Sequence, residues 1–304
     1  MPELPDITVY VDALTVKARG QTLQRLRVLN PFVLRTAMPP LAEAEGQPLV
    51  AVERLGKRVV LVLGNGRMLV IHLMIAGRLQ WQAAAAKPTG TATKRASKSV
   101  LARFEFESGH LVLTEAGTQR RASIHLLADR AALEAMDPGG IDVLTADAEA
   151  FIARLKSENH ALKRALTNPA LFSGIGNAYS DEILHRARLS PVALTRSLDL
   201  PAGLGLHSAC RAVLSEWTAR LRAGAFKTGW PDKVTAFRPE MAVHGRYGLP
   251  CPDCAAPVQR IVHASNETNY CARCQTGGKL LADRALSRLL KASWPRHIDD
   301  IEPH

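Results

Sequence analysis

Apolar residues in the first part of the chain follow two different periods. Between Pro5 and Gly20 they recur at positions 7, 11, 14 and 18, which is the spacing of one helix face. Pro5 suits a first helical turn, and Gly20 is placed to end the helix. Further along, apolar runs of strand length cover 26–29, 59–63, 68–73 and the hairpin 101–113. The pattern predicts a β-rich domain over residues 1–130 that opens with a helix.

After residue 140 the apolar spacing becomes helical. Candidate helices cover 148–156, 161–167, 178–188 and 207–223, and we expect them to form a helical domain over residues 140–225. A cysteine module over 240–276 and an extension over 277–304, whose leucines form an apolar helix face, complete the chain. Residues 83–99 are small and basic, and we expect a surface loop there.

The charge of the chain favours a polyanionic partner. Its 304 residues include 39 Lys and Arg against 28 Asp and Glu, which gives a formal net charge of +11. Nucleic acids bind such proteins by releasing counterions, although a basic protein without this partner has the same composition. No apolar run approaches the roughly 18 residues of a membrane span, and no signal peptide pattern is present. We therefore expect a cytoplasmic protein without a membrane partner.

Four of the five cysteines form two CxxC pairs, Cys251 with Cys254 and Cys271 with Cys274. Residues 255–270 separate the pairs, a spacing typical of a tetrahedral zinc site. Four protein ligands leave no open position on the metal, so we expect one structural zinc ion. A redox pair is the alternative, but two matched pairs argue against it. Cys210 lies in an apolar helical stretch and is expected in the core.

The first residues offer an unusual nucleophile. Removal of Met1 before a small residue exposes the Pro2 nitrogen as a secondary amine. Such an amine can attack C1′ of a sugar, and the resulting iminium supports both loss of the base and strand cleavage by elimination. Taken alone, Met1-Pro2 is more often simply the start of a chain.

Four motifs occur together and in order: Pro2-Glu3, Leu55-Gly56-Lys57-Arg58, the run 174–179 (GIGNAY), and the paired cysteines that end at Gln275. In this combination the chain resembles the formamidopyrimidine-DNA glycosylase/endonuclease VIII (Fpg/Nei) family over residues 1–276. The resemblance implies an α+β multidomain fold. Its parts are an N-terminal β-sandwich with an opening helix, a helix-two-turn-helix domain and a C-terminal β-hairpin zinc finger.

The same resemblance implies the catalytic residues. Pro2 takes the place of the family's nucleophile, and Glu3 that of its general acid/base. Lys57 takes the place of a cation that contacts the phosphate of the lesion, although an apolar strand flanked by a surface lysine would look the same. Asn177 follows Gly174 and Gly176 in the phosphate-binding turn of the helix-two-turn-helix motif.

Several DNA-contact positions depart from the family pattern. Ile75 stands where a methionine usually fills the space of the flipped nucleotide, and Met74 beside it is an alternative wedge. Ala122 stands where one branch has an intercalating phenylalanine, so Arg121 becomes the candidate for insertion.

The zinc hairpin departs as well. Asn266 replaces a usual phosphate-binding arginine, for which Arg260 is a candidate substitute.

The resemblance predicts a monomeric DNA glycosylase with AP lyase activity that acts on oxidised bases in damaged DNA, associated with the nucleoid when bound. The lesion stays open, because the opening MPELP is similar to the purine branch whereas the altered wedge and the segment 223–228 favour pyrimidines or an atypical lesion. The alternative from another class is a damage-binding protein without turnover. A zinc-ribbon RNA or ribosome-associated protein would explain the charge and the cysteines, but not Pro2-Glu3.

Overall fold

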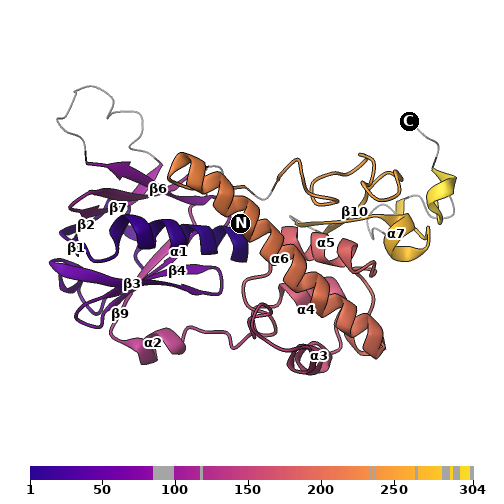
Figure 1. Cartoon of the computed structure of the whole chain (residues 1–304), viewed down its shortest axis with the longest axis horizontal. Helices are drawn as coiled ribbons and strands as arrows, with labels where there is room; N and C mark the ends of the chain where they lie inside the picture. The colour runs from indigo at the N-terminus through magenta and orange to yellow at the C-terminus, as the bar shows by residue number, and fades with distance from the viewer. Residues whose placement is uncertain are drawn as a thin grey trace. The chain divides into compact units, whose positions relative to one another are not determined.

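A computed structural model gives the fold of the chain (Figure 1). It describes residues 1–84, 99–116, 119–232, 234–235, 237–263, 266–282, 288–289 and 295–301. Residues 85–98 of the expected loop 83–99 lie outside these described residues, as do 283–287, 290–294 and 302–304 of the extension 277–304. The chain divides into two compact units, Met1–Pro138 with Trp217–Thr235, and Gly139–Glu216 with Ala236–His304.

The first unit is a β-sandwich of two antiparallel sheets that share one apolar core. One sheet has the strand order β1-β3-β4-β5-β9 and the other has the order β2-β7-β8-β6. The strands are β1 (Thr22–Leu23), β2 (Arg25–Val28), β3 (Gln47–Leu55), β4 (Arg58–Leu63), β5 (Met68–His72), β6 (Gly77–Ala83), β7 (Val100–Phe106), β8 (Gly109–Glu115) and β9 (Ser123–Leu127).

Strand β4 shows why an uninterrupted apolar run forms a strand here. Val59 and Leu61 belong to the core between the sheets, whereas Val60 and Val62 belong to a second apolar cluster with Leu133 of α2 (Arg130–Glu134). Both faces of the strand are therefore covered, and the alternation of polar residues that marks a half-exposed strand disappears.

The opening helix α1 (Leu4–Ala18) packs on this sandwich, and Figure 1 shows it in indigo across the strands β3 and β4. Ile7, Tyr10 and Leu14 recur at helical spacing and are buried in the sandwich core. Gly20, with φ +85°, lets the chain turn directly into β1.

The second unit is helical and carries the cysteine hairpin. Its elements are α3 (Ala148–Lys156), α4 (Leu162–Thr167), α5 (Asn177–Arg186), the first part of α6 (Leu200–Thr228), β10 (Gln259–His263), β11 (Asn266–Tyr270) and α7 (Ala272–Thr276). Asp147 starts α3 by accepting a hydrogen bond from the Ala150 N–H at 2.8 Å. The predicted α+β fold is confirmed. Within the described ranges, no helix combines the length and the apolar character that crossing a membrane requires.

Candidate functional site

Pro2 and Glu3 are both buried at the start of α1. Glu3 is the residue that caps the helix, and it forms a capping box with Asp6, whose Oδ2 accepts the Glu3 N–H at 2.9 Å. Pro5 lies in the first turn, where its missing N–H costs no helical hydrogen bond. The sequence 2–6 therefore fixes the backbone around Glu3 before any substrate is present.

The terminal amine lies among four charged groups. Burial lowers the pKa of the Met1 amino group below its usual value. The carboxylates of Glu3 and Asp6 oppose this shift, whereas the cations Arg78 and Lys57 add to it. A lowered pKa leaves more of an amine in its neutral, nucleophilic form near neutral pH.

Lys57 follows Gly56 in the turn between β3 and β4 and is half-buried. Burial lowers the pKa of Lys57, and the charge of Glu3 opposes that shift. Burial also lowers the pKa of His72, at the end of β5, to about 4, with Arg58 and Lys57 contributing. Groups with displaced pKa values occur more often at functional sites than elsewhere. Lys57 and His72 therefore support a functional site at the end of the sandwich that carries Pro2.

The turn at residues 73–77 presents an apolar side chain to solvent. Met74 is half-buried with a left-handed φ of +51°, and Ile75 next to it is 62% exposed. Gly77 closes the turn by donating its N–H to the Leu73 carbonyl at 2.9 Å, and a Cβ at this position would meet that oxygen at 2.3 Å. The turn is therefore tight and holds the Ile75 side chain outward.

Arg78, which the sequence analysis did not single out, holds this turn. Its Nη1 donates to the carbonyls of Gly77 at 2.7 Å and Ile75 at 3.2 Å, and its Nε donates to the Val234 carbonyl at 2.7 Å. One guanidinium thus joins the Ile75 turn to the segment after α6. This contact could hardly be predicted from the sequence, because Val234 is 156 residues away from Arg78.

Arg121 is exposed, and its backbone is fixed by a buried carboxylate. Glu115 at the end of β8 accepts the N–H groups of Arg121 at 2.9 Å and Ala122 at 3.0 Å. The Arg121 guanidinium donates to Gln119 Oε1 at 3.0 Å. Ala122 is buried, so only Arg121 of this pair points to solvent.

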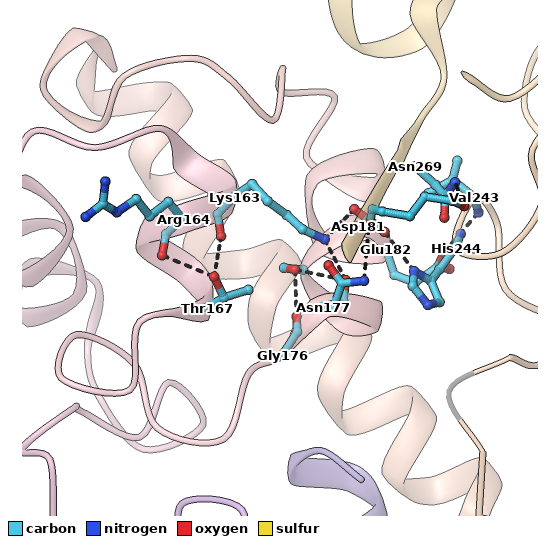
Figure 2. A network of polar contacts seen from close by, with 12 residues as sticks. Lys163, Arg164, Thr167, Gly176, Asn177, Asp181, Glu182, Val243, His244 and Asn269 are labelled. Atoms are coloured by element: carbon cyan, nitrogen blue, oxygen red, sulfur yellow. Dashed lines mark hydrogen bonds and ion pairs between the residues drawn. The ribbon is translucent and has the colours of Figure 1, made fainter. Parts of the chain in front are cut away.

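In the second unit, Asn177 begins α5 directly after Gly176. Figure 2 shows the contacts that hold it. The Asn177 Nδ2 donates to the Glu267 carbonyl of β11 at 2.9 Å, and Lys163 Nζ donates to the Asn177 carbonyl at 2.6 Å. Gly174, with φ +82°, supplies the left-handed step of the preceding turn. The turn is thereby tied both to α4 and to the hairpin.

A buried polar network extends from this turn (Figure 2). The fully buried Asp181 carboxylate accepts from Lys163 at 2.5 Å and contacts His244 Nδ1 at 2.7 Å. Glu182 accepts three backbone N–H groups, from residues 242, 243 and 244, at 2.7–2.9 Å. Asn269 Oδ1 accepts the Gly245 N–H at 2.8 Å. Removing one partner would leave a buried charge unpaired, so the network specifies a single arrangement.

The four paired cysteines lie together. Their sulfur atoms are all within 4.8 Å of one another, with Cys251 Sγ and Cys274 Sγ 3.9 Å apart and Cys254 Sγ and Cys271 Sγ 3.4 Å apart. Zinc–sulfur bonds of about 2.3 Å in a tetrahedron place sulfurs roughly 3.8 Å apart, so the cluster fits a zinc ion.

Two neighbours support this cluster. Gln275 Oε1 accepts the Cys271 N–H at 2.8 Å while its Nε2 donates to the Leu189 carbonyl at 2.9 Å. His185 Nε2 lies 3.3 Å from Cys251 Sγ. Such contacts orient thiolate ligands and fix their place in the fold.

Arg260 and Asn266 lie on opposite faces of the hairpin. Arg260 pairs with Asn269, and Asn266 pairs with His263. Arg260 and His263 are three positions apart on β10, and side chains an odd number of positions apart on a strand point to opposite faces. The Arg260 guanidinium stacks on the Tyr247 ring at 4.2 Å and pairs with Glu267 at 3.2 Å. Asn266 is exposed at the start of β11. Any contact that Arg260 makes with a ligand therefore comes from a different face than that of Asn266.

Three known domain families match the chain. They are the formamidopyrimidine-DNA glycosylase N-terminal domain over residues 1–122, the formamidopyrimidine-DNA glycosylase H2TH domain over 140–225, and a zinc finger found in FPG and IleRS over 248–277.

Relatives extend the match over most of the chain. A formamidopyrimidine-DNA glycosylase of Thermus thermophilus is 32% identical and covers 91% of this chain and 100% of its own length. An uncharacterized formamidopyrimidine-DNA glycosylase-like protein of Mycobacterium tuberculosis is 41% identical over 52% of this chain and 95% of its own.

Solved structures agree in fold. The crystal structure of the MutM (Fpg) protein from Thermus thermophilus has a TM-score of 0.72 and 29% identity, covering 90% of this chain and 98% of its own. A complex between Lactococcus lactis Fpg and DNA that contains an abasic site has a TM-score of 0.77 at 23% identity, with 90% and 99% covered.

Proposed function

The chain belongs to the formamidopyrimidine-DNA glycosylase family, and from this premise we propose that it is a base-excision-repair DNA glycosylase with AP lyase activity. One observation carries the proposal: Pro2 and Glu3 lie together at the buried start of α1, where the charges of Glu3, Arg78 and Lys57 act on the amino group of the adjacent Met1. Related proteins are named formamidopyrimidine-DNA glycosylases, and the Fpg of Lactococcus lactis is solved with DNA that contains an abasic site and with DNA that contains Fapy-dG.

In the proposed reaction, removal of Met1 makes the Pro2 nitrogen a secondary amine. Its lone pair forms a bond to C1′ of the damaged nucleotide, and the bond from C1′ to the base breaks; the base leaves with the bonding pair and a proton from Glu3, which then takes up the proton that the Pro2 nitrogen loses. Glu3 supplies the proton that opens the sugar ring at O4′. The iminium that results acidifies C2′, and loss of a C2′ proton expels the 3′ phosphate. Water then releases Pro2.

The DNA contacts are divided between the two units. In the first unit, Lys57 contacts the lesion phosphate, Ile75 or Met74 fills the space of the flipped base, and Arg121 inserts beside it.

In the second unit, Asn177 at the start of α5 binds phosphate with its neighbouring backbone N–H groups. Arg260 and Asn266 add contacts from the hairpin. One structural zinc ion on Cys251, Cys254, Cys271 and Cys274 keeps that hairpin folded and takes no part in the reaction.

Oxidised pyrimidines are the proposed lesion class. Residues 223–228, which stand in place of the family's guanine-covering loop, continue the helix α6. A continuous helix has its backbone N–H groups bonded internally and does not offer them to a purine. Ala122 is buried and too small to intercalate.

Sodium borohydride trapping tests the function. Borohydride reduces the iminium and fixes the protein to DNA, so a protein that begins at Pro2 is expected to form an adduct on duplexes with an abasic site, oxidised guanine, formamidopyrimidine or thymine glycol. The lesion trapped fastest identifies the branch. Pro2→Gly should reduce trapping roughly tenfold, because a primary amine replaces the proline amine.

Pro5→Ala is the matched control, because it changes a proline of the same helix turn and leaves the terminal amine intact. Tight, salt-sensitive binding without an adduct on any lesion would instead support the damage-binding protein without turnover. A monomer in the cytoplasm, associated with the nucleoid when bound, is the corresponding proposal for assembly and location.

Arg78→Met is expected to move the acid limb of the trapping rate to higher pH. Burial, Arg78 and Lys57 lower the pKa of the Met1 amino group, whereas Glu3 and Asp6 raise it. We expect the same charges to act on the adjacent Pro2 nitrogen once Met1 is removed, so loss of the Arg78 charge should raise the pKa of that amine and leave less of it neutral. The measurement is the trapping rate on an abasic duplex as a function of pH.

Arg78→Lys keeps the charge but loses the guanidinium that joins the Ile75 turn through Nη1 to Val234 through Nε, so its acid limb should stay near that of the parent. An unchanged pH profile in Arg78→Met would contradict the electrostatic role.

A further inference from the structure

Helix α1 carries apolar residues on a second side. Ile7, Tyr10 and Leu14 face the core, whereas Val9, Ala13 and Val16 recur at helical spacing on another side of the helix. Val9 is buried, Ala13 is half-buried against the core, and Val16 is 84% exposed. A large apolar side chain that solvent reaches, next to further apolar residues, indicates a contact surface.

The last turns of α6 lie along this face, as Figure 1 shows for the orange end of α6 beside the indigo α1. Together the two helices enclose an open groove of about 760 Å³, with Val9, Ala13 and Val16 on one wall and Ala223, Ala225 and Phe226 on the other. Phe226 is 91% exposed at the rim. From Val9 to Lys17 the groove follows about 12 Å of helix axis, which suits an elongated occupant better than a compact one.

The groove is held open from both sides. An ion pair between Asp12 and Arg222, at 2.6 Å, bridges the two helices. Trp230, just after α6, is buried beside Tyr10 at a ring distance of 5.8 Å, and its Nε1 donates to the Leu79 carbonyl at 3.0 Å. These contacts anchor the end of α6 in the core, so the walls are present without a ligand.

Positive charge surrounds the apolar lining. Lys17 and Lys227 stand at the groove, while the charge of Arg222 is balanced by Asp12, the acidic residue among the groove's lining residues. The floor offers apolar side chains where a phosphate would need donors, so the surface suits neither DNA nor RNA. A ligand with apolar side chains flanked by carboxylates would complement both the apolar floor and the basic rim of the groove.

We propose that this groove is a docking site for an acidic amphipathic helix of a partner protein. The partner's helix places apolar side chains, spaced at positions i, i+3 or i+4, and i+7, between α1 and α6. The Asp and Glu residues of the partner's helix face Lys17 and Lys227. The groove thereby recruits the enzyme to another protein without occupying the residues proposed to bind DNA.

Fluorescence anisotropy with the full-length, zinc-loaded protein tests the proposal. The probe is a labelled synthetic helix with leucines at i, i+3, i+4 and i+7 and Asp or Glu elsewhere; the comparison peptide carries Lys at the acidic positions. We expect micromolar binding of the acidic peptide and at least roughly tenfold weaker binding of the basic one. Phe226→Asp and Val16→Asp should each weaken the acidic peptide roughly tenfold, and Lys227→Glu should also weaken it.

Phe32→Asp is the matched control, because Phe32 is 79% exposed in the same unit and does not line the groove. It should bind the acidic peptide as the parent does. Equal binding of the acidic and the basic peptide would overturn the proposal, as would equal affinity of Phe226→Asp and Phe32→Asp for the acidic peptide. An apolar dye that binds at Phe226 when the acidic peptide does not bind would also overturn it. Loss of borohydride trapping in Phe226→Asp would assign the groove to DNA instead.

Discussion

Replacing Glu3 with glutamine is expected to slow excision of a damaged base at least about 100-fold, the usual range for loss of a positioned general acid/base. The side chain is buried at the start of α1, and its charge acts on the neighbouring Met1 amine more strongly than that of Asp6 does. Glutamine keeps the size of the side chain and an oxygen for the capping box, so the helix start should persist. The measurement is single-turnover excision on a duplex carrying the preferred lesion.

The same variant separates the two steps of the reaction. On a preformed abasic site the base has already left, so Glu3→Gln should still form a borohydride adduct, slowed much less than excision. Asp6→Asn is the matched control, because its amide oxygen can still accept the Glu3 N–H while the neighbouring carboxylate charge is lost. Excision by Glu3→Gln at the rate of the parent protein would show that the acid/base assignment is wrong.

The second large effect is expected from Cys254→Ser, which should lose zinc and bind DNA at least roughly tenfold more weakly. A structural zinc contributes about 10–16 kcal/mol of binding free energy that a hairpin of this size cannot replace. The hairpin also holds Asn177 through the Glu267 carbonyl, so its loss loosens the start of α5. Metal content, near-ultraviolet circular dichroism and DNA affinity measure the three consequences.

Cys210→Ala is the control for this experiment, because Cys210 is fully buried in α6 and lies outside the sulfur cluster. It should cost some stability through the small cavity and retain both zinc and DNA binding. A Cys254→Ser protein with a full complement of zinc and unchanged affinity would argue against the structural role.

The sequence predicted those elements whose apolar period is long or whose turn is distinctive. The helix expected over 148–156 is α3 to the residue, and the strands expected over 59–63 and 68–73 are β4 and β5. Helix α6 extends beyond the expected 207–223 at both ends. The expected start was too late because Pro201, Gly203 and Gly205 argue against a helix by propensity. Asp199 nevertheless caps that end by accepting the Ala202 N–H at 2.9 Å, and Leu206 is buried. Packing and capping outweigh propensity there.

The candidate site divides in the same way. The spacing of the four paired cysteines was enough to single them out, whereas Pro2 and Glu3 were singled out by the family resemblance. Arg78 gave no such signal, because its function depends on carbonyls brought near by the fold.

The network around Asp181 was also missed. Its partner His244 is 63 residues away, and neither residue belongs to a recognisable pattern. Tertiary contacts between distant side chains require the structure.

The buried position of Asp181 has a practical consequence for handling the protein. Concentrated salt screens exposed charges and removes bound nucleic acid, but it acts little on an ion pair that solvent does not reach. Asp181 is fully buried, His244 is buried and Lys163 is largely buried. A wash in concentrated salt should therefore free the protein of cellular DNA and leave this network intact, and after desalting the Asn177 turn should be ready to bind without refolding.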